Sequence, residues 1–399
     1  MALPFERLLT FELLNYTVKL SYLVGILILL YSLILLLKKS LNLTLYRDEL
    51  WLLFFVLAAT LSCFWSIDLK RSLVILSVII FVVLLFYCLR RLIDEALKEK
   101  LISLLIVLGF LISLFALWQF FVDKTALSSL SYLRPQYQSG VFGFPRVQAS
   151  FLEPLYLANF LLIPIFFNFY RLLKKPSMAN YLILTLTGTA FFLTLSRGAF
   201  FALLMGILLT AVLIFIYQRG KIVNFFKSSA FILLAGALAV LSIYSVSGGS
   251  GLKTYSGHAV VNDIRSGESV VDRKYTMSVA LEESLLHPFG IGVGAFGALS
   301  EFSGDIANQG YQTVNNLYLE ILVETGFLGL ILFLIFLLHY ALNLSSDFKK
   351  DVLWKTICLS LFLAIFIQYL FFSTIYIIYI WAVLAILSPK TKELKNERT

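Results

Sequence analysis

Long apolar runs are the feature of this sequence that most restricts its fold. About eleven runs follow one another along the 399 residues, and each is close to the roughly 20 residues with which an α-helix crosses about 30 Å of hydrocarbon. Only 14% of the residues are charged, too few to cover a soluble domain of this size. We therefore expect an all-α, polytopic membrane protein of about 11–12 transmembrane helices. The expected spans are residues 20–37, 50–66, 72–89, 101–122, 151–170, 179–196, 198–217, 228–246, 315–339, 353–372 and 374–388.

The basic residues predict how these spans are oriented. About 20 of the 32 lysines and arginines fall in alternate short loops, which the positive-inside rule assigns to the cytoplasm. The net charge of +9 is thus a topology signal, and we expect no nucleic-acid partner. The predicted organisation is an N-terminal transmembrane bundle over 1–246, a large external loop over 247–314, and C-terminal helices with a cytoplasmic tail over 315–399.

The sequence also predicts the structure of two regions outside the spans. The opening segment "FERLLTFELLNY" is amphipathic, so it lies at the membrane interface or adds a twelfth helix. The external loop begins with "SVSGGSGLKTYSG", expected to be flexible, and continues into "ESVVDRKYTMSVALEESLLH", expected to be helical. It then turns through "PFGIGVGAFG", whose glycines allow a close approach of backbone to another segment. Because long structured loops are usually functional, we expect the chemistry at the outer face.

Arg197 is a lone cation between two apolar runs, in "FFLTLSRGAFFALLMG". Exposed to lipid at depth it would cost roughly 2.5–3.5 kcal/mol. One interpretation is an interfacial anchor that snorkels to the headgroups. The other is an anion ligand that faces the protein, helped by Ser196 and by the free backbone N–H groups at the start of the next helix.

Other basic residues on the same predicted side could join Arg197. Arg146 precedes the fifth span, Arg273 lies in the large loop, and Lys70 and Arg71 lie in a short outer turn. Several guanidinium groups around one external cavity would suit a dianionic group, because guanidinium is permanently charged and matches phosphate oxygens. The alternatives are an ion pair on the helix surface for Arg273 and headgroup contacts for Lys70 and Arg71.

Acidic residues and histidine are the candidates for proton transfer. Glu153 opens a span beside Arg146 and is interpreted as functional. Glu320 and Glu324 lie four residues apart on one helix face, and for Glu324 we favour a structural role between helices. His258 lies in the loop and could act as a general base, although a lone loop histidine is more often incidental. No cluster has metal-ligand spacing and no nucleotide-binding motif is present, so we expect neither metal nor cofactor.

Five motifs occur in a fixed order: "LSCFWSIDLKRSL", "RVQASFLEPLYLANFL", "TLSRGAF", "HPFGIGVGAF" and "NNLYLEILVETGFLGL". Together they resemble the bacterial O-antigen ligase and O-antigen polymerase superfamily, most strongly from about 141 to 333. The resemblance implies a GT-C-like glycosyltransferase of the bacterial inner membrane. Its donor would be a glycan on undecaprenyl pyrophosphate at the periplasmic face, with Arg197 and Arg273 holding the pyrophosphate.

The resemblance also distinguishes two kinds of enzyme, which differ in the acceptor of the glycan. Ligases, which move the glycan onto lipid A–core, usually have His-Asn where this chain has Asn315-Asn316, and "NPN" where it has "LEP". Both differences favour a polymerase, which joins lipid-linked repeat units, and imply a chain-length-regulating membrane protein as a partner. Asn315, Asn316 and Tyr318 are expected to contact substrate.

The predicted reaction is direct displacement at the anomeric carbon, without metal or nucleotide. Stabilisation of the departing pyrophosphate would come from arginines, and the base would be Glu153, Asp272 or His258. A transporter for lipid or anion is the rival from another class. Broken helices and internal symmetry would be expected of it, and neither is evident in the sequence. A structural membrane scaffold is a third alternative.

Overall fold

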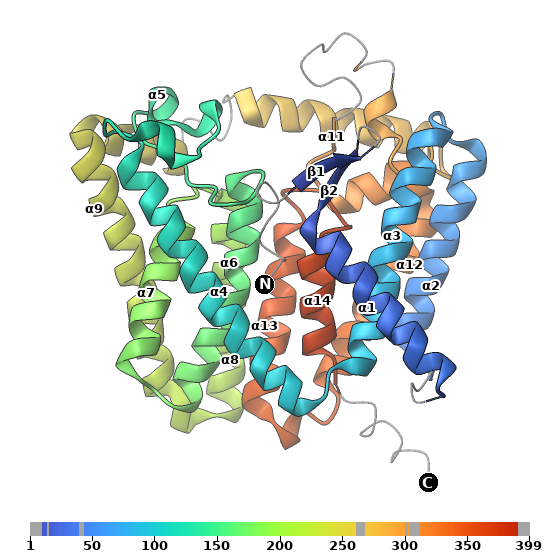
Figure 1. Cartoon of the computed structure of the whole chain (residues 1–399), viewed down its shortest axis with the longest axis horizontal. Coiled ribbons are helices and arrows are strands. Elements are labelled where there is room, and N and C mark those ends of the chain that lie inside the picture. Colours follow the sequence, from blue (N-terminus) through green and yellow to red (C-terminus); the bar gives the residue numbers. More distant parts are fainter. Residues whose placement is uncertain are drawn as a thin grey trace. The chain divides into compact units, whose positions relative to one another are not determined.

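A computed structural model of the chain describes residues 10–13, 16–39, 44–260, 268–299, 302 and 312–389. Each of the expected spans coincides with an apolar helix in these ranges (Figure 1). Within these described ranges, eight helices are long and apolar enough to cross a membrane, and α7, α13 and α14 are shorter apolar helices. The prediction of an all-α, polytopic membrane protein is therefore confirmed. The helices are α1 (Leu20–Leu37), α2 (Arg47–Ser62), α3 (Leu69–Leu92), α4 (Glu95–Val122), α6 (Pro154–Lys174), α7 (Met178–Phe192), α8 (Arg197–Tyr217), α9 (Ile222–Val260), α12 (Leu317–Ser345), α13 (Val352–Gln368) and α14 (Ile378–Leu387).

Two local predictions are wrong. The described residues in and just after the opening segment form the antiparallel strands β1 (Thr10–Leu13) and β2 (Tyr16–Lys19), with Thr10 opposite Lys19, so a twelfth helix there is wrong, whereas a position at the membrane interface stays a prediction. Its alternation of polar and apolar residues fits a strand, and a run this short cannot separate a period of 2 from one of 3.6. The segment "SVSGGSGLKTYSG" belongs to α9 and is helical, with a break at Gly248 (φ 64°).

The chain divides into two compact units, each made of segments that are distant in sequence. Unit 1 comprises Met1–Val24, Glu95–Arg265 and Asp347–Gln368, and unit 2 comprises Gly25–Asp94, Ser266–Ser346 and Tyr369–Thr399. The first contains α4, α6, α7, α8, α9 and α13. The second contains α2, α3, α12 and α14 together with α11 (Glu268–Leu286), the expected loop helix.

Unit 1 is built around α6, the most buried of the candidate spans. Pro164 inside this helix fits against Gly109 of α4, where an added Cβ would lie 2.4 Å from the proline ring. Gly206 lets α8 approach α6 and α13 in the same way, and Asn159 of α6 donates to Gln368 of α13 at 2.9 Å. Small residues and buried amides thus hold these helices together, as is typical within membranes.

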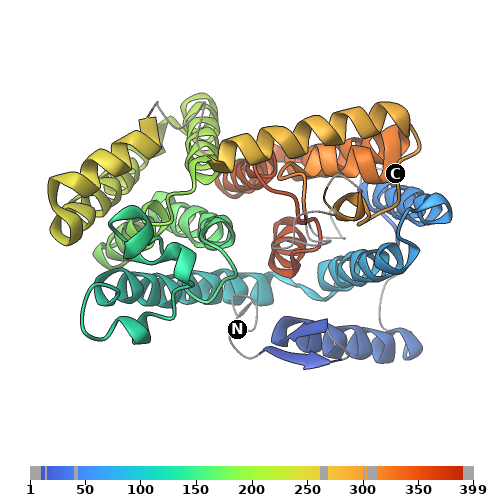
Figure 2. The same cartoon turned by 90° about the horizontal axis from the view of Figure 1, so that it is seen from above.

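Unit 2 pairs α12 with α2 and α14 with α3. Phe55 and Phe333 join the first pair with ring centroids 5.3 Å apart, and Phe86 and Trp381 join the second at 5.8 Å. The loop helix α11 runs crosswise at one end of these helices (Figures 1 and 2). It packs on the start of α12 and on the glycine-rich turn through an apolar cluster of Val279, Ala280, Ile291, Ala295, Phe296, Leu299, Phe302, Val314 and Val323.

Helix α12 is broken at Gly326 (φ 74°, ψ −176°), a break that the sequence analysis did not find. The glycine turn, defined as residues 288–297, supplies hydrogen-bond partners to the backbone groups that the break leaves free. Ile291 N–H donates to the freed carbonyl of Val323 at 2.9 Å, Gly292 N–H to Glu324 at 3.0 Å, and Phe327 N–H to Pro288 at 3.1 Å. Backbone groups left unpaired inside a membrane cost several kcal/mol each, so these bonds are what permit the break.

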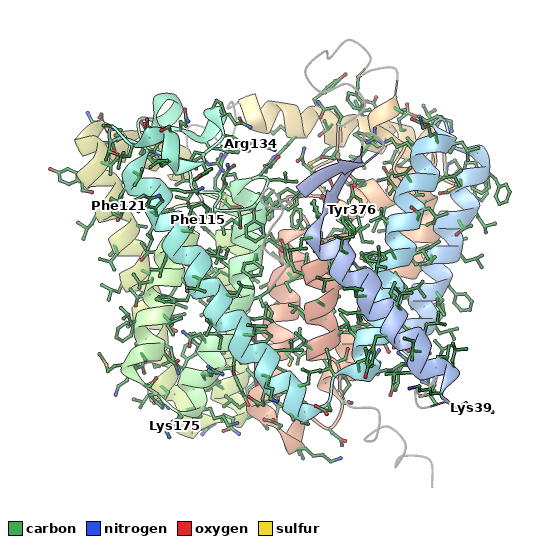
Figure 3. The ribbon with its side chains drawn as sticks, in the orientation of Figure 1. Lys39, Phe115, Phe121, Arg134, Lys175 and Tyr376 are labelled. Atoms are coloured by element: carbon green, nitrogen blue, oxygen red, sulfur yellow. The ribbon has the colours of Figure 1, made fainter. Side chains whose placement is uncertain are left out.

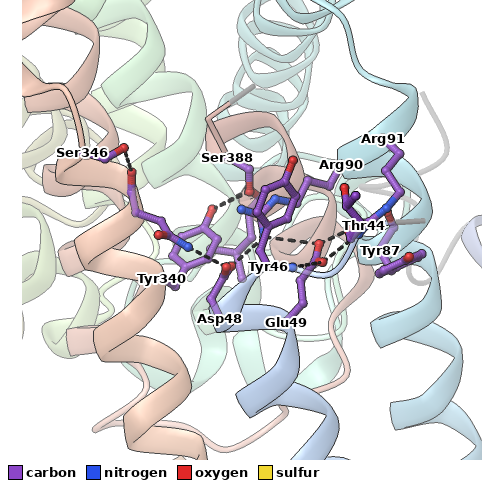
Figure 4. Close-up of polar contacts among 12 residues, drawn as sticks. Thr44, Tyr46, Asp48, Glu49, Tyr87, Arg90, Arg91, Tyr340, Ser346 and Ser388 are labelled. Carbon is purple, nitrogen blue, oxygen red and sulfur yellow. Dashed lines mark hydrogen bonds and ion pairs between the residues drawn. The ribbon is translucent and has the colours of Figure 1, made fainter. Parts of the chain in front are cut away.

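A buried ionic network closes the other end of unit 2 (Figure 4). Arg90 Nη1 lies 2.6 Å from Asp48 Oδ2, and Arg91 Nη2 lies 2.7 Å from Glu49 Oε2. Asn343 of α12 adds a hydrogen bond of 2.5 Å to Asp48. The four charged side chains are at most 3% exposed. The network therefore ties α2, α3 and α12 together by charges that cannot reach water.

We expect Arg90→Met to lower the free energy of unfolding by about 3–5 kcal/mol, because it leaves Asp48 buried beside an incomplete set of partners. Chemical or thermal unfolding of the protein in detergent measures this change. Arg47→Met is the matched control, since Arg47 begins the same α2 but is exposed. Equal stability of the two variants would contradict the role of the network.

Gly326→Ala is expected to destabilise unit 2 by at least about 1–3 kcal/mol, because a side chain is strained at positive φ. The new Cβ would also lie 2.4 Å from the carbonyl oxygen of Pro288. Thermal unfolding reports the change. Gly249→Ala serves as the control, since nothing lies within 4 Å of its added Cβ. If both substitutions were neutral, the fit of the glycine turn into the break would be wrong.

Candidate functional site

The connection from α7 to α8 presents Arg197 at a helix start. Helix α7 ends at Phe192, Leu195 adopts positive φ (54°), and Ser196 is the N-cap of α8, which begins at Arg197. The turn is held locally by Thr194, whose Oγ1 accepts from Ser196 N–H at 3.3 Å. Because the first N–H groups of a helix lack helical partners, this turn offers donors and a cation to an anion.

Arg146 packs against the same turn. Its Nε and Nη2 both donate to the carbonyl of Thr194, each at 3.3 Å, and Val147 N–H donates to Leu193 at 3.4 Å. The loop that carries Arg146 is therefore joined to the α7–α8 turn. The structure thus brings Arg146 to the segment that contains Arg197, within unit 1, and their convergence on one cavity stays a prediction.

Tyr137 also contacts Arg146. Arg146 N–H donates to the carbonyl of Tyr137 at 2.9 Å, and its guanidinium lies 5.7 Å from the ring centroid. Burial raises the pKa of Tyr137, and the negative charge of Glu153 raises it further. Glu153 is the N-cap residue of α6, so it stands in the same charged group. Figure 3 shows Arg134, from the segment between α4 and α6, and Lys175 at opposite ends of unit 1.

Arg197 differs from Arg146 in its partners. It is half-buried, and no hydrogen bond or ion pair from the described part of the chain reaches its side chain. Ser196 beside it is 5% exposed, and its Oγ is buried without a hydrogen-bond partner among the described residues. A half-buried cation next to a buried hydroxyl without a partner, at a helix start, is an arrangement that can bind an anion.

Unit 2 holds a second polar site, which we call the carboxylate pocket. It is a cavity of about 40 Å³ between α3, α12, the glycine turn and the connection from α13 to α14. Glu320 Oε2 accepts from Val314 N–H at 3.2 Å, and Glu324 Oε1 accepts from Phe296 N–H at 3.4 Å. Space of this size holds one or two water molecules but no sugar ring. Its polar lining residues are Arg71, Gln312, Thr313, Glu320, Glu324, Thr325 and Tyr376.

Two asparagines lie directly in front of α12, close in sequence to the lining residues Thr313 and Leu317. Asn316 is the N-cap, and its Oδ1 accepts from the N–H groups of Tyr318 and Leu319 at 3.0 and 3.2 Å. Asn315 adopts positive φ (57°), which asparagine tolerates better than most residues, and its N–H donates to Ser373 Oγ at 3.1 Å. Both asparagines therefore stabilise the local backbone at the start of α12.

The remaining predicted residues are spread over unit 2. Arg273 is half-buried on α11, and Thr276, one turn further along, donates to the Val314 carbonyl at 3.4 Å in front of α12. Lys70 is exposed and Tyr318 half-buried. The side chains of His258 and Asp272 lie outside the described residues.

The predicted arginines fall into two sets. Arg146 and Arg197 belong to unit 1, whereas Arg71 and Arg273 belong to unit 2. Convergence of all four on one cavity stays a prediction. Among the described residues, no group of three or more His, Cys, Asp or Glu side chains could hold a metal ion.

The sequence analysis missed most of the carboxylate pocket. Glu320 was visible as a carboxylate one turn below Asn316, but Gln312, Thr313 and Tyr376 lie in connecting segments whose packing no periodicity reveals. The one usable signal was the spacing of Glu320 and Glu324, which predicts a shared helix face.

Taken together, the apolar helices and these recessed polar groups define a multi-pass membrane protein with polar residues at helix ends. Residues 182–334 match the family described as O-antigen ligase. This match, which covers less than half of the chain, supports a relation of that part to the O-antigen ligase and polymerase superfamily. The matched segment includes the α7–α8 turn, α11, the glycine turn and the first part of α12. No curated protein sequence matches the chain.

Two substitutions of Asn316 distinguish its role as the N-cap of α12 from the predicted contact with substrate. Asn316→Ala should lower stability by about 0.5–2 kcal/mol, whereas Asn316→Asp keeps the capping oxygen and should be close to the parent protein. Unfolding in detergent checks both. A comparable loss in the aspartate variant would show that the cap is not what stabilises this end of α12.

Proposed function

We propose that the protein is a glycosyltransferase that takes a glycan from undecaprenyl pyrophosphate at the periplasmic face of a bacterial inner membrane. Its proposed product is a longer lipid-linked polysaccharide, made by joining repeat units. The observation that carries this proposal is Arg197, a half-buried cation without a partner among the described residues, at a helix start inside the O-antigen ligase match.

The proposed chemistry is direct displacement. The acceptor hydroxyl oxygen attacks the anomeric carbon, and the bond from this carbon to the pyrophosphate oxygen breaks. Undecaprenyl pyrophosphate therefore leaves with the electron pair. Negative charge grows on the leaving group during this step. Arg197, Ser196 and the first N–H groups of α8 are fixed donors that would stabilise this charge more in the transition state than in the ground state. Arg273, on α11 of unit 2, is proposed to bind a phosphate group of the substrate.

Two acceptors remain to be separated by experiment. The family description favours a ligase with lipid A–core as acceptor. Asn315, where ligases usually have histidine, favours a polymerase with a second lipid-linked repeat unit. Purified protein with lipid-linked oligosaccharide and each acceptor in turn decides between them. We expect lengthened lipid-linked glycan. Product on lipid A–core alone would make the protein a ligase, and no product with either acceptor would favour a transporter.

Arg197→Lys tests the proposed leaving-group site. Lysine keeps the charge but loses the planar fork, so we expect the rate of glycan transfer to fall by about 10²–10³-fold, the usual cost of one fixed donor. Arg219→Lys is the matched control, because Arg219 is exposed just beyond the opposite end of α8. Transfer by Arg197→Lys at the parent rate would count against the phosphate role.

A further inference from the structure

The segment that precedes α6 contacts the turn that carries Arg197. Arg146 directs two N–H groups of its guanidinium, at Nε and Nη2, to the carbonyl oxygen of Thr194, at 3.3 Å each. One residue further along, Val147 N–H donates to the carbonyl of Leu193 at 3.4 Å. Two consecutive residues of the turn are thus held by two consecutive residues of this segment, and all of them belong to unit 1.

This segment is itself fixed to α4 by a buried amide. The Oε1 atom of Gln119 accepts from Ala149 N–H at 2.8 Å and from Gln148 N–H at 3.3 Å. Its Nε2 donates to the Ala149 carbonyl at 3.2 Å, and Arg146 N–H donates to the carbonyl of Tyr137 at 2.9 Å. Buried hydrogen-bond networks of this kind make the local structure rigid. The backbone that carries Arg146 is therefore a fixed support for the α7–α8 turn.

The turn needs such support because its backbone is strained. Leu195 has a φ of 54°, and residues other than glycine keep this left-handed conformation only where neighbouring contacts hold them. Thr194 lies at the centre of these contacts, since its Oγ1 accepts from Ser196 N–H and its carbonyl accepts from Arg146. Loss of the Arg146 bonds would let the turn relax, and Ser196 and Arg197 would move with it.

The side chain of Arg146 is oriented by the protein. Its planar fork offers two N–H donors in a fixed geometry, which the ammonium group of lysine does not provide. The guanidinium also lies 5.7 Å from the ring centroid of Tyr137, within the range of a cation–π contact. By contrast, no hydrogen bond or ion pair from the described residues reaches the side chain of Arg197. The two arginines therefore have different roles.

We propose that Arg146 is a positioning residue of the transfer reaction. It holds the α7–α8 turn so that Arg197, Ser196 and the first N–H groups of α8 are presented together to the departing pyrophosphate. This inference rests on the proposed function. It differs from the direct contact with an anion that the sequence predicts for Arg146, because the guanidinium acts here through the backbone carbonyl of Thr194.

The test is a double-mutant cycle on the purified protein, read out as the rate of glycan transfer per folded molecule. Arg146→Lys should lower this rate by about 10–100-fold, because misplacing positioned groups by 1 Å costs up to about 10²-fold. In the Arg197→Lys background the same change should cost only about 3-fold or less, since residues of one network are not additive. General destabilisation by Arg146→Lys would instead reduce the rate by the same factor in both backgrounds.

Arg219→Lys is the matched control for this cycle. Arg219 also donates from Nε to a backbone carbonyl, that of Phe215 at 3.3 Å, but it is exposed and lies beyond the opposite end of α8. It should leave the transfer rate unchanged alone and in the Arg197→Lys background.

A second pair of variants keeps the test informative if Arg146→Lys folds poorly. Thr194 is buried, so its hydroxyl acts on the turn and not on a substrate. Thr194→Val keeps the shape of the side chain but removes the acceptor of Ser196 N–H, and should lower the transfer rate about 10-fold or more. Thr194→Ser keeps the hydroxyl and should transfer at the parent rate.

Three results would overturn the assignment: equal losses from Arg146→Lys in both backgrounds, transfer at the parent rate by Arg146→Lys, or transfer at the parent rate by Thr194→Val. A parent protein that transfers to neither acceptor would refute the proposed function instead. The same cycle, measured as the affinity for inorganic pyrophosphate by calorimetry, would then decide the role of Arg146. A parent protein that also binds no pyrophosphate would overturn both.

Discussion

The hydrogen bonds between the glycine turn and the break in α12 are the interaction on which this end of unit 2 depends. Inside a membrane a helix can be interrupted only if other groups satisfy the freed carbonyls and amides. Here residues 288–292 supply those groups from a different segment of the chain. The same turn is fixed on its other side, where Trp65 Nε1 donates to Phe289 and Val293 N–H donates to Ser62 Oγ, at 3.1 Å each. Two transmembrane helices and a loop are thereby held as one assembly.

That assembly places the carboxylate pocket. Arg71 begins α3 just after the turn that the glycine segment fixes, and Glu324 lies at the edge of the break in α12. Positive φ at Gly290, Gly292 and Gly294 allows the backbone approach, and added Cβ atoms there would lie 2.3–2.5 Å from neighbouring atoms. The pocket is therefore a consequence of backbone fit. Its chemistry comes from two glutamates and an arginine that this fit brings together.

Charged residues in this apolar frame follow two patterns. Arg90 and Arg91 are buried with carboxylate partners and serve the architecture of unit 2. Arg197 has no such partner among the described residues, and its neighbour Ser196 has an unsatisfied hydroxyl. Burying a polar atom without a partner costs free energy, but such atoms also occur on Arg90, so the contrast between the two patterns lies in the ion pairs. This contrast, more than the number of arginines, separates structural cations from candidate functional ones.

Hydropathy alone determined the membrane class and the approximate position of every span, because a bilayer imposes length and apolar composition directly on the local sequence. The strands at residues 10–19 and the helical course of α9 were mispredicted, since short amphipathic or glycine-containing runs fit more than one local structure. Arg197 could be singled out from sequence because a lone cation between spans is conspicuous by itself. Only the tertiary structure decided that Glu320 and Arg71 share a cavity and that residues 288–292 complete α12. Such pairings join segments far apart in the chain, and they are set by packing and backbone hydrogen bonds that leave no period in the sequence.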